Sequence, residues 1–322
     1  MVDNGSDSQN VDLLKENYGN HPKVNLILND ENLGFTKGNN AIMREIINRN
    51  DLPEYIILLN NDTVVDPEWL QNLVASAKRN NADIVSSKMI DYYERNKMDN
   101  SGHMMLNTGE VIPVAHGLPV DEYVEGKENL GACAGAALYS SKMLKRIGLF
   151  DERFNTGYED AEIGIRAVVL GYKCFFEPTA IVYHKMGRSV KKVFNYDYSL
   201  SIQKHIWYSY LKLMPISVIL ITLPSFVFKY FSMLIIDLVF WKPQYLKIMY
   251  QSLKETFIDD FSEIRIAREK FMSNYKPISS SKILRKQTFF LLFDIKRFYK
   301  FYILRKTSAL DSYGKVESVE TS

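Results

Sequence analysis

Three carboxylates follow one another closely at the start of an expected helix. Glu159, Asp160 and Glu162 come soon after Gly157, and the apolar spacing over residues 163–169 is typical of a helix. A helix dipole stabilises a charged carboxylate at its N-terminus by roughly 0.3–1 kcal/mol, so we expect these acids to be ionised at neutral pH. An ionised carboxylate can act as a general base or bind a metal. Because Asp and Glu are also favoured at helix starts for capping alone, an ordinary helix N-terminus is the alternative interpretation.

A further acid follows an expected buried strand. Residues 55–59 form a continuous apolar run of strand length, and Asn60 and Asp62 come directly after it. Ligands of open α/β sheets bind at the carboxyl ends of the strands, so Asp62 has the position of a functional acid. A turn or cap residue is the alternative, because Asp66 and Pro67 soon open another helix.

A histidine occupies an equivalent position further along the chain. Residues 173–176 and 180–184 read as two strand segments on either side of Pro178, and His184 ends the second segment. A lone histidine is usually a surface or core residue. In a chain that also has Asp62 and Asp160 at the ends of elements, His184 is a candidate third member of a metal or phosphate site.

The elements that must position these residues alternate between strands and helices. Residues 2–6 read as a strand end that passes into a turn, and residues 29–40 as a Gly- and Asn-rich loop before a helix at 41–48. The backbone N–H groups of such a loop can bind phosphate, although a plain turn is the alternative and no Walker A sequence is present. Residues 91–130 are expected to be a polar excursion without regular periodicity that faces the substrate.

Composition narrows the classes of protein that the chain can belong to. A length of 322 residues, 46% of them hydrophobic and 24% charged, predicts one large globular domain with extensions. The net charge of +2 gives no general attraction to nucleic acid. The two cysteines, Cys133 and Cys174, form no CxxC motif, which excludes a zinc knuckle or a disulfide scaffold and favours a reducing, cytoplasmic location. No signal peptide is expected at the N-terminus.

Seven segments, taken together and in order, resemble glycosyltransferase family 2 and are most similar to its rhamnosyltransferase-like members. They are residues 2–6 (VDNGS), 32–40 (NLGFTKGNN), 59–63 (LNNDT), 131–137 (GACAGAA), 148–154 (GLFDERF), 158–162 (YEDAE) and 184–189 (HKMGRS). The resemblance covers residues 1–190. It implies a GT-A fold, an α/β architecture with a Rossmann-like mixed sheet flanked by helices. It also implies transfer of a sugar, with inversion, from a nucleotide-diphosphosugar with the help of Mg²⁺ or Mn²⁺.

The resemblance implies a catalytic or metal-binding role for several of these residues. Asp160 matches the general base, with Glu159 as its catalytic neighbour and Glu162 as a supporting acid. Asp62 matches the last acid of the DxD-type motif, which binds the metal or the diphosphate. His184 matches a histidine that binds the metal in some relatives.

Donor binding is implied for a second set of residues. Asp3 matches the acid that contacts the nucleotide base, and Asn32, Gly34 and Gly38 lie in the matching donor-binding loop. Asn60 stands where the family has the first acid of its metal motif and, with Asp62, completes the implied donor site.

One departure from the family concerns the N-terminus. The family begins with a strand and a helix ahead of the strand that leads into residues 2–6, and both are absent from this sequence. The first strand is central in a GT-A sheet, so its loss is expected to leave backbone groups unpaired and to remove part of the nucleotide pocket. We therefore expect an N-terminally truncated domain, and an inactive fragment that retains membrane or partner binding is the alternative function.

The C-terminal third is expected to be helical and to associate with a membrane. Residues 213–228 carry no charge but include Pro215 and Pro224, and Lys229 and Asp237 interrupt the apolar sequence that follows. Sixteen residues are fewer than the ~20 that span a bilayer. An interfacial or re-entrant pair of helices at 213–241 is therefore favoured over a transmembrane helix.

Basic and aromatic side chains alternate in residues 282–306, as is typical of a lipid surface. They are Lys282, Arg285, Lys286, Phe289, Phe290, Phe293, Lys296, Arg297, Phe298, Tyr299, Lys300, Phe301, Tyr302, Arg305 and Lys306. Nucleic acid is not an expected partner, because no nucleic-acid-binding fold accompanies this segment.

We therefore predict three parts: a GT-A domain at 1–190, a helical membrane-associating region at 191–306 and a disordered tail at 307–322. The predicted partners are a nucleotide-diphosphosugar donor, a glycan or lipid-linked acceptor, and the cytoplasmic face of the cell membrane. A nucleotidyltransferase on a related α/β sheet is a third possibility; it would also need a metal and a nucleotide, but it would not need Asp160 as a base.

Overall fold

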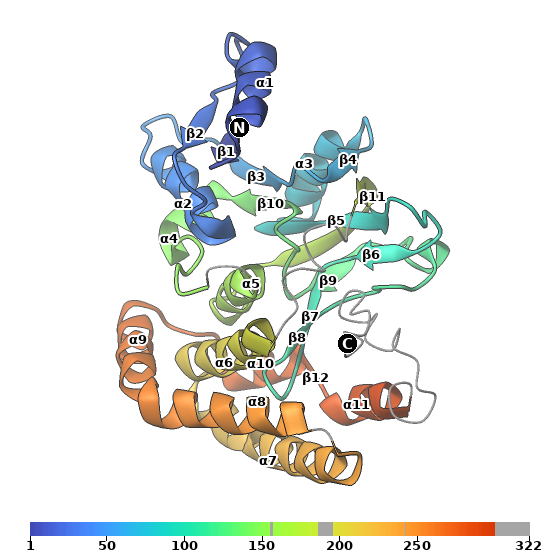
Figure 1. Cartoon of the computed structure of the whole chain (residues 1–322), viewed down its shortest axis with the longest axis vertical. Helices are drawn as coiled ribbons and strands as arrows, with labels where there is room; N and C mark the ends of the chain where they lie inside the picture. Colours follow the sequence, from blue (N-terminus) through green and yellow to red (C-terminus); the bar gives the residue numbers. More distant parts are fainter. Residues whose placement is uncertain (155–156, 186–195, 242, 300–322) are drawn as a thin grey trace.

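A mixed seven-stranded sheet forms the centre of the computed structural model, which describes residues 1–154, 157–185, 196–241 and 243–299 (Figure 1). Its main path runs in the order β3-β10-β5-β11-β4, with β6 added beside β5 and β9 beside β11. The strands are β3 (Tyr55–Leu59), β4 (Thr63–Val65), β5 (Ile84–Asp91), β6 (Met98–Asn100), β9 (Lys127–Asn129), β10 (Ala136–Ser140) and β11 (Cys174–His184). Strands β5 and β11 are parallel, and the other pairs are antiparallel.

Strand β11 confirms the strand structure predicted on either side of Pro178 and joins the two parts in one strand. Its pairing with β5 shifts register between Glu177 and Ile181, and Pro178 lies in this irregularity. Proline cannot donate a ladder hydrogen bond and is tolerated at bulges for that reason. The strand therefore continues past the proline and delivers His184 to the end of the sheet.

The expected irregular excursion at 91–130 instead contains several short strands and a 3₁₀-helix, η1 (Val120–Glu122). Besides β6 and β9, it forms β7 (His103–Leu106) and β8 (Val111–Pro113). These two strands join β12 (Gln287–Thr288) in a three-stranded sheet of order β12-β7-β8. Strands of three or four residues are too short to show alternation in a sequence, and two of the pairings, β9 with β11 and β7 with β12, join residues that are distant along the chain.

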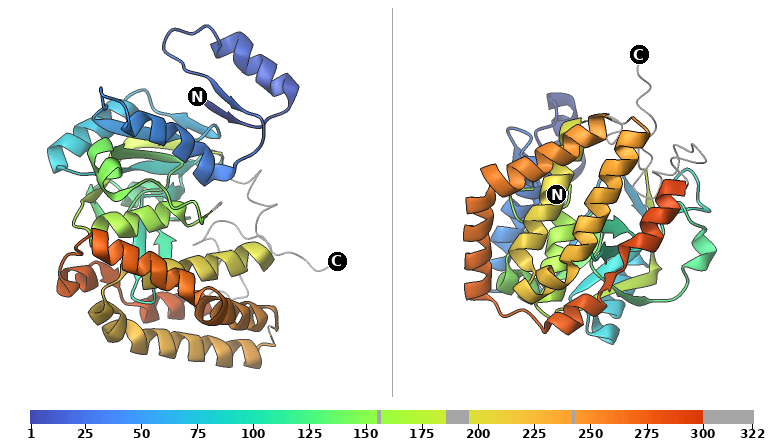
Figure 2. Two further views of the ribbon diagram at one scale, coloured as in Figure 1. Left: turned by 90° about the vertical axis from the view of Figure 1, so that its left-hand side faces the viewer. Right: turned by 90° about the horizontal axis from the view of Figure 1, so that it is seen from below.

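The N-terminal residues form a small unit of their own, which extends from one end of the molecule (Figure 2, left). Strand β1 (Val2–Asn4) pairs in parallel with β2 (Ile27–Asn29) in a separate two-stranded sheet. The helices of this unit are α1 (Ser8–Tyr18) and α2 (Gly34–Ile47). Helix α2 begins seven residues before the expected start at 41, so Gly34 and Gly38 are helical residues and do not belong to an open loop.

Helix α2 connects this unit to the rest of the protein. The Thr36 hydroxyl donates a hydrogen bond to the Phe154 carbonyl, and the Asn40 amide donates to the Phe150 carbonyl at 2.8 Å. The Phe150 N–H in turn donates to Asn40 Oδ1 at 3.2 Å. Both side chains are buried, so the segment that precedes the acidic residues is fixed against α2.

Helices cover the sheet and form a thick layer below it (Figure 1). Those in the first half of the protein are α3 (Trp69–Asn80), α4 (Ser141–Ile147) and α5 (Glu159–Val169). The later ones are α6 (Tyr196–Leu213), α7 (Ile216–Val239), α8 (Pro243–Lys254), the π-helix η3 (Glu255–Asp259), α9 (Phe261–Asn274), α10 (Ser280–Arg285) and α11 (Phe290–Phe298). One continuous hydrophobic core contains residues of α2, β10, α5, α6, α7 and α9. The disordered tail predicted at 307–322 lies outside the described residues.

Helix α7 is one continuous helix of 24 residues with Pro224 inside it, so the predicted pair of helices is wrong. By length and composition alone it could cross a membrane. Lys229 and Asp237 are both buried on its inner face, and Lys229 pairs with Glu110 and Asp294. The opposite face is apolar, with side chains that are each at least 45% exposed: Ile216, Leu220, Ile221, Leu223, Val227, Phe228, Phe231, Ile235, Leu238 and Val239. Lys229 and Asp237 therefore interrupt the apolar sequence but not the exposed apolar face of the helix.

Candidate active site

The pairing of two strands brings Asp62 and His184 together at one end of the sheet. Asp62 lies in the turn between β3 and β4, and β4 pairs with β11 so that Thr63 is opposite His184. Asp62 Oδ1 is shielded from solvent and lies 3.3 Å from His184 Nε2. The Lys185 N–H donates to the Asp62 carbonyl at 2.8 Å, which fixes the turn. Of the motif at 184–189, residues 186–189 lie outside the described part of the chain.

Asp99 and His116 extend this pair into the interior, and the sequence analysis missed both. Asp99 Oδ2 lies 2.8 Å from His184 Nδ1, and Asp99 Oδ1 lies 3.3 Å from His116 Nδ1. Although burial opposes ionisation, the hydrogen bonds with His116 and His184 lower the pKa of Asp99 to about 2. Burial also disfavours a charged His184, but its hydrogen bonds with Asp62 and Asp99 raise its pKa to about 9. No spacing signal identifies Asp99, because it enters the site through the short strand β6.

The acids of the catalytic segment begin α5, as expected, but they differ in environment. Tyr158, with a φ of 80°, turns the chain into the helix. Asp160 is half-buried, and its Oδ2 accepts a hydrogen bond from the Ala134 N–H at 3.2 Å. The Nε2 atom of His103, from β7, lies 3.9 Å from the same oxygen. Asp160 therefore lies close to both the small-residue segment and strand β7 of the three-stranded sheet.

Glu159 contradicts the expectation that these acids are all ionised. Its side chain is buried, and this burial, together with the neighbouring charge of Asp160, raises the pKa of Glu159 to about 8. The free-energy cost of removing a charged carboxylate from water exceeds the stabilisation that a helix dipole provides at a partly exposed N-terminus. At neutral pH, Glu159 therefore keeps its proton.

Glu162 is a structural residue, so its expected role as a supporting acid is wrong. It is fully buried, and its carboxylate pairs with Arg166 at 2.6 Å and with Lys212 at 2.8 Å. Lys212 also pairs with Asp151 at 2.7 Å. One oxygen of Glu162 thus pairs within α5, the other joins α5 to Lys212 of α6, and neither is available to a substrate.

Cys133 precedes two residues that contact the candidate base and the strand-end turn: the Ala134 N–H donates to Asp160 Oδ2, and the Gly135 carbonyl accepts from the Asn60 N–H. Burial raises the pKa of this thiol well above its usual value, and the charges of Asp160 and Asp99 raise it further. The candidate base and the turn that carries Asn60 and Asp62 thus contact neighbouring residues of one short segment, 133–135.

Asn60 borders the same region. Its N–H donates to the Gly135 carbonyl at 2.8 Å, and a Cβ added at Gly135 would come within 3.3 Å of the Asn60 amide nitrogen. The small residues before β10 thus let the turn that carries Asn60 and Asp62 pack closely against their backbone.

The four candidate donor-binding residues of the N-terminal unit gather around Asn4, which the sequence analysis did not single out. The Asn4 amide donates to Asn32 Oδ1 at 3.0 Å and to the Gly34 carbonyl at 3.1 Å. A Cβ at Gly38 would touch the same amide at 3.4 Å. Asp3, which is buried, accepts a hydrogen bond from the Ser6 N–H at 3.0 Å. These residues form a second group, on the β1–β2 sheet and the start of α2.

The donor atoms at the strand ends fit a divalent cation that keeps substrate oxygens as ligands. Within the described part of the chain, no cluster of three or more His, Cys, Asp and Glu residues could hold a metal. Asp62 and His184 nevertheless supply one carboxylate and one imidazole side by side. Mg²⁺ is commonly bound by one or two carboxylates together with water and substrate phosphates, so two protein ligands suffice.

Residues 1–148 match the family model of glycosyl transferase family 2. The matched part of the chain, a little under half of it, is therefore similar to a glycosyltransferase domain. The match includes the candidate donor-binding residues, Asn60 and Asp62, whose individual roles it does not test. It ends before α5, so the roles of Glu159, Asp160 and His184 stay predictions.

Curated relatives are distant and much longer than this chain. Uncharacterized protein y4gI of Sinorhizobium fredii is 23% identical over 199 residues, which are 59% of this chain and 21% of that protein. O-antigen biosynthesis protein RfbC of Myxococcus xanthus is 27% identical over 158 residues, 46% of this chain and 12% of that protein. The chain thus spans about a fifth or less of the length of these relatives.

Similarity to a solved structure supports the fold. The structure of S. aureus TarS 1-349 in complex with UDP-GlcNAc has a TM-score of 0.50 and 16% sequence identity, and the similarity covers 85% of this chain and 79% of that one. The mixed α/β fold of GT-A type is therefore confirmed.

The raised pKa of Glu159 predicts a specific dependence of stability on pH. Between about pH 4.5 and about pH 8 the folded state keeps a proton that the unfolded state has lost, so the free energy of unfolding falls as pH rises. We expect Glu159→Gln to remove a slope of up to roughly 1.4 kcal/mol per pH unit, measured by urea unfolding across this range.

Glu152→Gln is the matched control, because the pKa of Glu152 is lowered by Asn40 and Arg44 and this residue stays charged throughout the range. A wild-type slope in the Glu159→Gln variant would show that Glu159 is ionised in the folded protein.

Proposed function

We propose that the chain transfers a sugar from a nucleotide-diphosphosugar to a hydroxyl of a glycan, with inversion at the anomeric carbon. The observation that carries this proposal is that Asp160 and the turn of the Asp62–His184 pair contact neighbouring residues of one segment: the Ala134 N–H donates to Asp160, and the Gly135 carbonyl accepts from the Asn60 N–H. A displacement reaction of this kind needs a general base for the acceptor hydroxyl and a binding site for the departing diphosphate, and this region offers a candidate for each.

Asp160 is the proposed general base. As the acceptor oxygen bonds to the anomeric carbon, its proton passes to Asp160 and the bond between the sugar and the diphosphate breaks. Attack from the face opposite the leaving group inverts the configuration. Glu159 remains protonated beside Asp160 at neutral pH, so a second negative charge does not oppose the approach of the donor.

Asp62 and His184 are the proposed ligands for Mg²⁺ or Mn²⁺, together with oxygens of the donor diphosphate. Such an ion, when bound, neutralises charge on the departing diphosphate. His184 must lose its proton to become a ligand, so binding is expected to weaken as the pH falls. Asn60 is uncharged, and the site therefore offers fewer negative charges than a pair of acids would.

We assign the nucleotide of the donor to the group around Asn4. Asp3 provides a buried carboxylate, and the N-terminus of α2 provides backbone N–H groups next to Asn32. Rhamnose is favoured as the sugar by the similarity of the motifs to rhamnosyltransferase-like members. The name of the Myxococcus xanthus relative, an O-antigen biosynthesis protein, supports a cell-envelope or lipid-linked acceptor.

We further propose that the exposed face of α7 binds the cytoplasmic face of the cell membrane. The helix lies along the outer edge of the helical layer (Figure 1), with an apolar face outward and its two charges inward. This arrangement suits an interfacial helix whose apolar side enters the lipid headgroup boundary. The basic and aromatic residues of 282–299 follow in α10 and α11, and those at 300–306 lie outside the described residues.

A second candidate is an inactive chain that retains membrane or partner binding. It is favoured by one observation: β1 and β2 form a sheet separate from the one that carries β3 and β11. The donor-binding group and the strand-end pair therefore belong to different sheets, and a loss of alignment between them would prevent transfer.

Asp160→Asn is expected to reduce transfer by about 10²–10⁴-fold, the range for loss of a general base, while donor binding is retained. Release of nucleoside diphosphate from a panel of UDP-, GDP- and dTDP-sugars, with Mn²⁺ and a bacterial lipid extract as acceptor, measures transfer. Calorimetry with the same donors measures binding. Asp66→Asn, at an exposed turn, is the control. An equal loss of donor binding would contradict the role of Asp160, and unchanged turnover would favour nucleotidyl transfer.

Asp99→Asn is expected to weaken Mn²⁺ binding about 10- to 100-fold, because Asp99 holds the second nitrogen of His184. Paramagnetic resonance of free Mn²⁺ during a titration gives the dissociation constant without any turnover. Asp91→Asn is the matched control, since Asp91 caps a turn through the Tyr93 and Glu94 N–H groups. The same affinity in both variants would show that His184 is not a ligand or does not depend on Asp99.

Leu220→Asp combined with Phe231→Asp should abolish membrane binding through α7. Each side chain contributes ~1.5–3 kcal/mol when withdrawn from water, so the loss should exceed about tenfold. Co-sedimentation with vesicles of phosphatidylethanolamine and phosphatidylglycerol tests this. The control is Leu13→Asp with Leu70→Asp, two equally exposed leucines on α1 and α3. Equal binding by both double variants would place the membrane contact elsewhere.

A further inference from the structure

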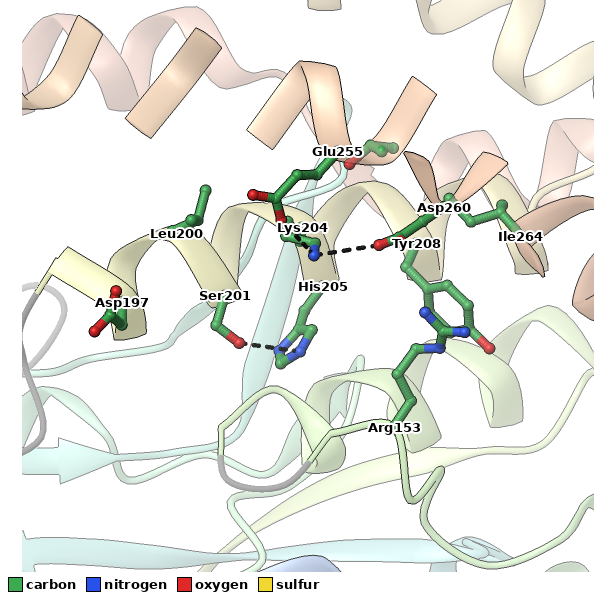
Figure 3. A pocket seen from close by; sticks show the side chains of 11 residues that line it. Arg153, Asp197, Leu200, Ser201, Lys204, His205, Tyr208, Glu255, Asp260 and Ile264 are labelled. Carbon is green, nitrogen blue, oxygen red and sulfur yellow. Dashed lines mark hydrogen bonds and ion pairs between the residues drawn. The ribbon is translucent and has the colours of Figure 1, made fainter. Parts of the chain in front are cut away.

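A cavity of about 300 Å³ lies between α6, the π-helix η3, the start of α9 and the segment that ends at Phe154 (Figure 3). Its lining is Arg153, Asp197, Leu200, Ser201, Lys204, His205, Tyr208, Glu255, Thr256, Asp260 and Ile264. None of these residues belongs to the donor or metal site described above. Its volume is at the lower end of the range for small-ligand pockets, about 300–1,000 Å³.

The cavity adjoins the catalytic acids through α6. Burial raises the pKa of Tyr198 to about 12, and the charges of Glu159 and Asp160 contribute to this rise. A Cβ at Gly157, two residues before Glu159, would come within 3.0 Å of the Tyr198 hydroxyl. Ser201 follows Tyr198 by one helical turn, and His205 by two. Two residues that line the cavity, Asp197 and Ser201, thus flank Tyr198 on α6, and Tyr198 lies against the glycine that precedes the acids of α5.

The charged groups of the cavity neutralise one another. Lys204 pairs with Glu255 at 2.6 Å and with Asp260 at 3.2 Å. Arg153 pairs with Glu263, and its guanidinium lies 4.5 Å from the centre of the Tyr208 ring. Carboxylates therefore already bind both cations, which disfavours a phosphate or another anion as the ligand.

The remaining polar groups suit a ligand that both donates and accepts hydrogen bonds. Ser201 Oγ lies 3.2 Å from His205 Nε2, and the His205 ring packs edge-on against Phe154 at 4.5 Å. Burial lowers the pKa of His205 to about 4, so the imidazole is neutral and has one donor and one acceptor nitrogen. The exposed carboxylate of Asp197 adds an acceptor at the rim. The hydroxyl groups of a ligand both donate and accept hydrogen bonds, so they match these donors and acceptors better than an ion does.

We propose that this cavity binds an uncharged sugar ring of the acceptor, next to the hydroxyl that Asp160 deprotonates. The proposal rests on the proposed function, because it assigns the cavity to the acceptor of that reaction. Ser201 and His205 would hydrogen-bond ring hydroxyls, and a sugar lacking those hydroxyls would be rejected because buried polar groups would lose their partners.

Saturation-transfer NMR with a panel of methyl glycosides, including methyl α-L-rhamnoside and methyl β-N-acetylglucosaminide, tests binding to the full-length protein. Ser201→Tyr fills the cavity, and Ser273→Tyr makes the same change on the exposed face of α9. Asp197→Ala alters the rim without touching the core. We expect at least one glycoside to bind, with affinity lowered at least about tenfold by Ser201→Tyr, severalfold by Asp197→Ala, and not by Ser273→Tyr.

Calorimetry with the nucleotide-sugar panel and Mn²⁺ runs alongside, so that the two proposals fail separately. If the wild-type protein binds none of the nucleotide-sugars, the proposed function is wrong, whether or not a glycoside binds. If the protein binds the donor but no glycoside, the assignment of the cavity to the acceptor is wrong, and the proposed function stands. The same holds if a glycoside binds but Ser201→Tyr and Asp197→Ala leave its signal unchanged. Displacement of the glycosides by inorganic phosphate would show an anion site and would also overturn it. If Ser201→Tyr does not fold, Asp197→Ala decides the outcome.

Discussion

The position of the catalytic acids depends on a buried cluster of charges between α5 and α6. Glu162 accepts from Arg166 and Lys212, and Lys212 also reaches Asp151. Burying so many charges adds little net stability, because desolvation offsets most of the attraction between them. The cluster instead permits one arrangement, since any shift of α5 along α6 would leave a charge buried without a partner. Asp160 lies two residues before Glu162, so this constraint determines where the candidate base lies.

Backbone contact reinforces the same arrangement. The Cα atoms of Gly131 and Gly164 approach so closely that a Cβ at Gly164 would come within 2.8 Å of the Leu130 carbonyl. Helix α5 therefore packs directly on the segment that leads to Cys133 and Ala134, and the Ala134 N–H reaches Asp160. Close packing and the charge cluster act on opposite sides of one helix. Together they fix the half-buried Asp160 next to the buried Glu159.

Local signals in the sequence were enough to predict the elements that carry the site, but not its interior. The apolar run before Asn60, the helix after Gly157 and the strand that ends at His184 were all expected, because each depends on neighbouring residues. Asp99, His103 and His116 were not, because they come from the stretch 91–130, whose strands of three or four residues are too short to show a periodic pattern. The ionisation of Glu159 was predicted wrongly for a related reason: the helix dipole is a local property, whereas burial depends on the whole fold. In the sequence, Lys229 and Asp237 interrupt an apolar segment. In the fold, the packing of α7 places both side chains on its buried face.

Helix α6 links the three surfaces that the proposals concern. Its Lys212 binds α5, its Ser201 and His205 line the cavity, and Trp207 and Tyr210 pack on Phe226 of α7 at 4.8 and 4.9 Å. The hydroxyl of Tyr210 also bonds Thr222 of α7 at 2.7 Å. Since aromatic contacts and a buried hydrogen bond hold α7 on one face of α6 and buried ion pairs hold α5 on another, α6 is a rigid spacer between them. The distance from the exposed face of α7 to Asp160 is then a fixed property of the fold. An acceptor anchored in a membrane under α7 would therefore have to extend a definite length to reach the base, and the cavity on α6 lies along the helix that spans this distance.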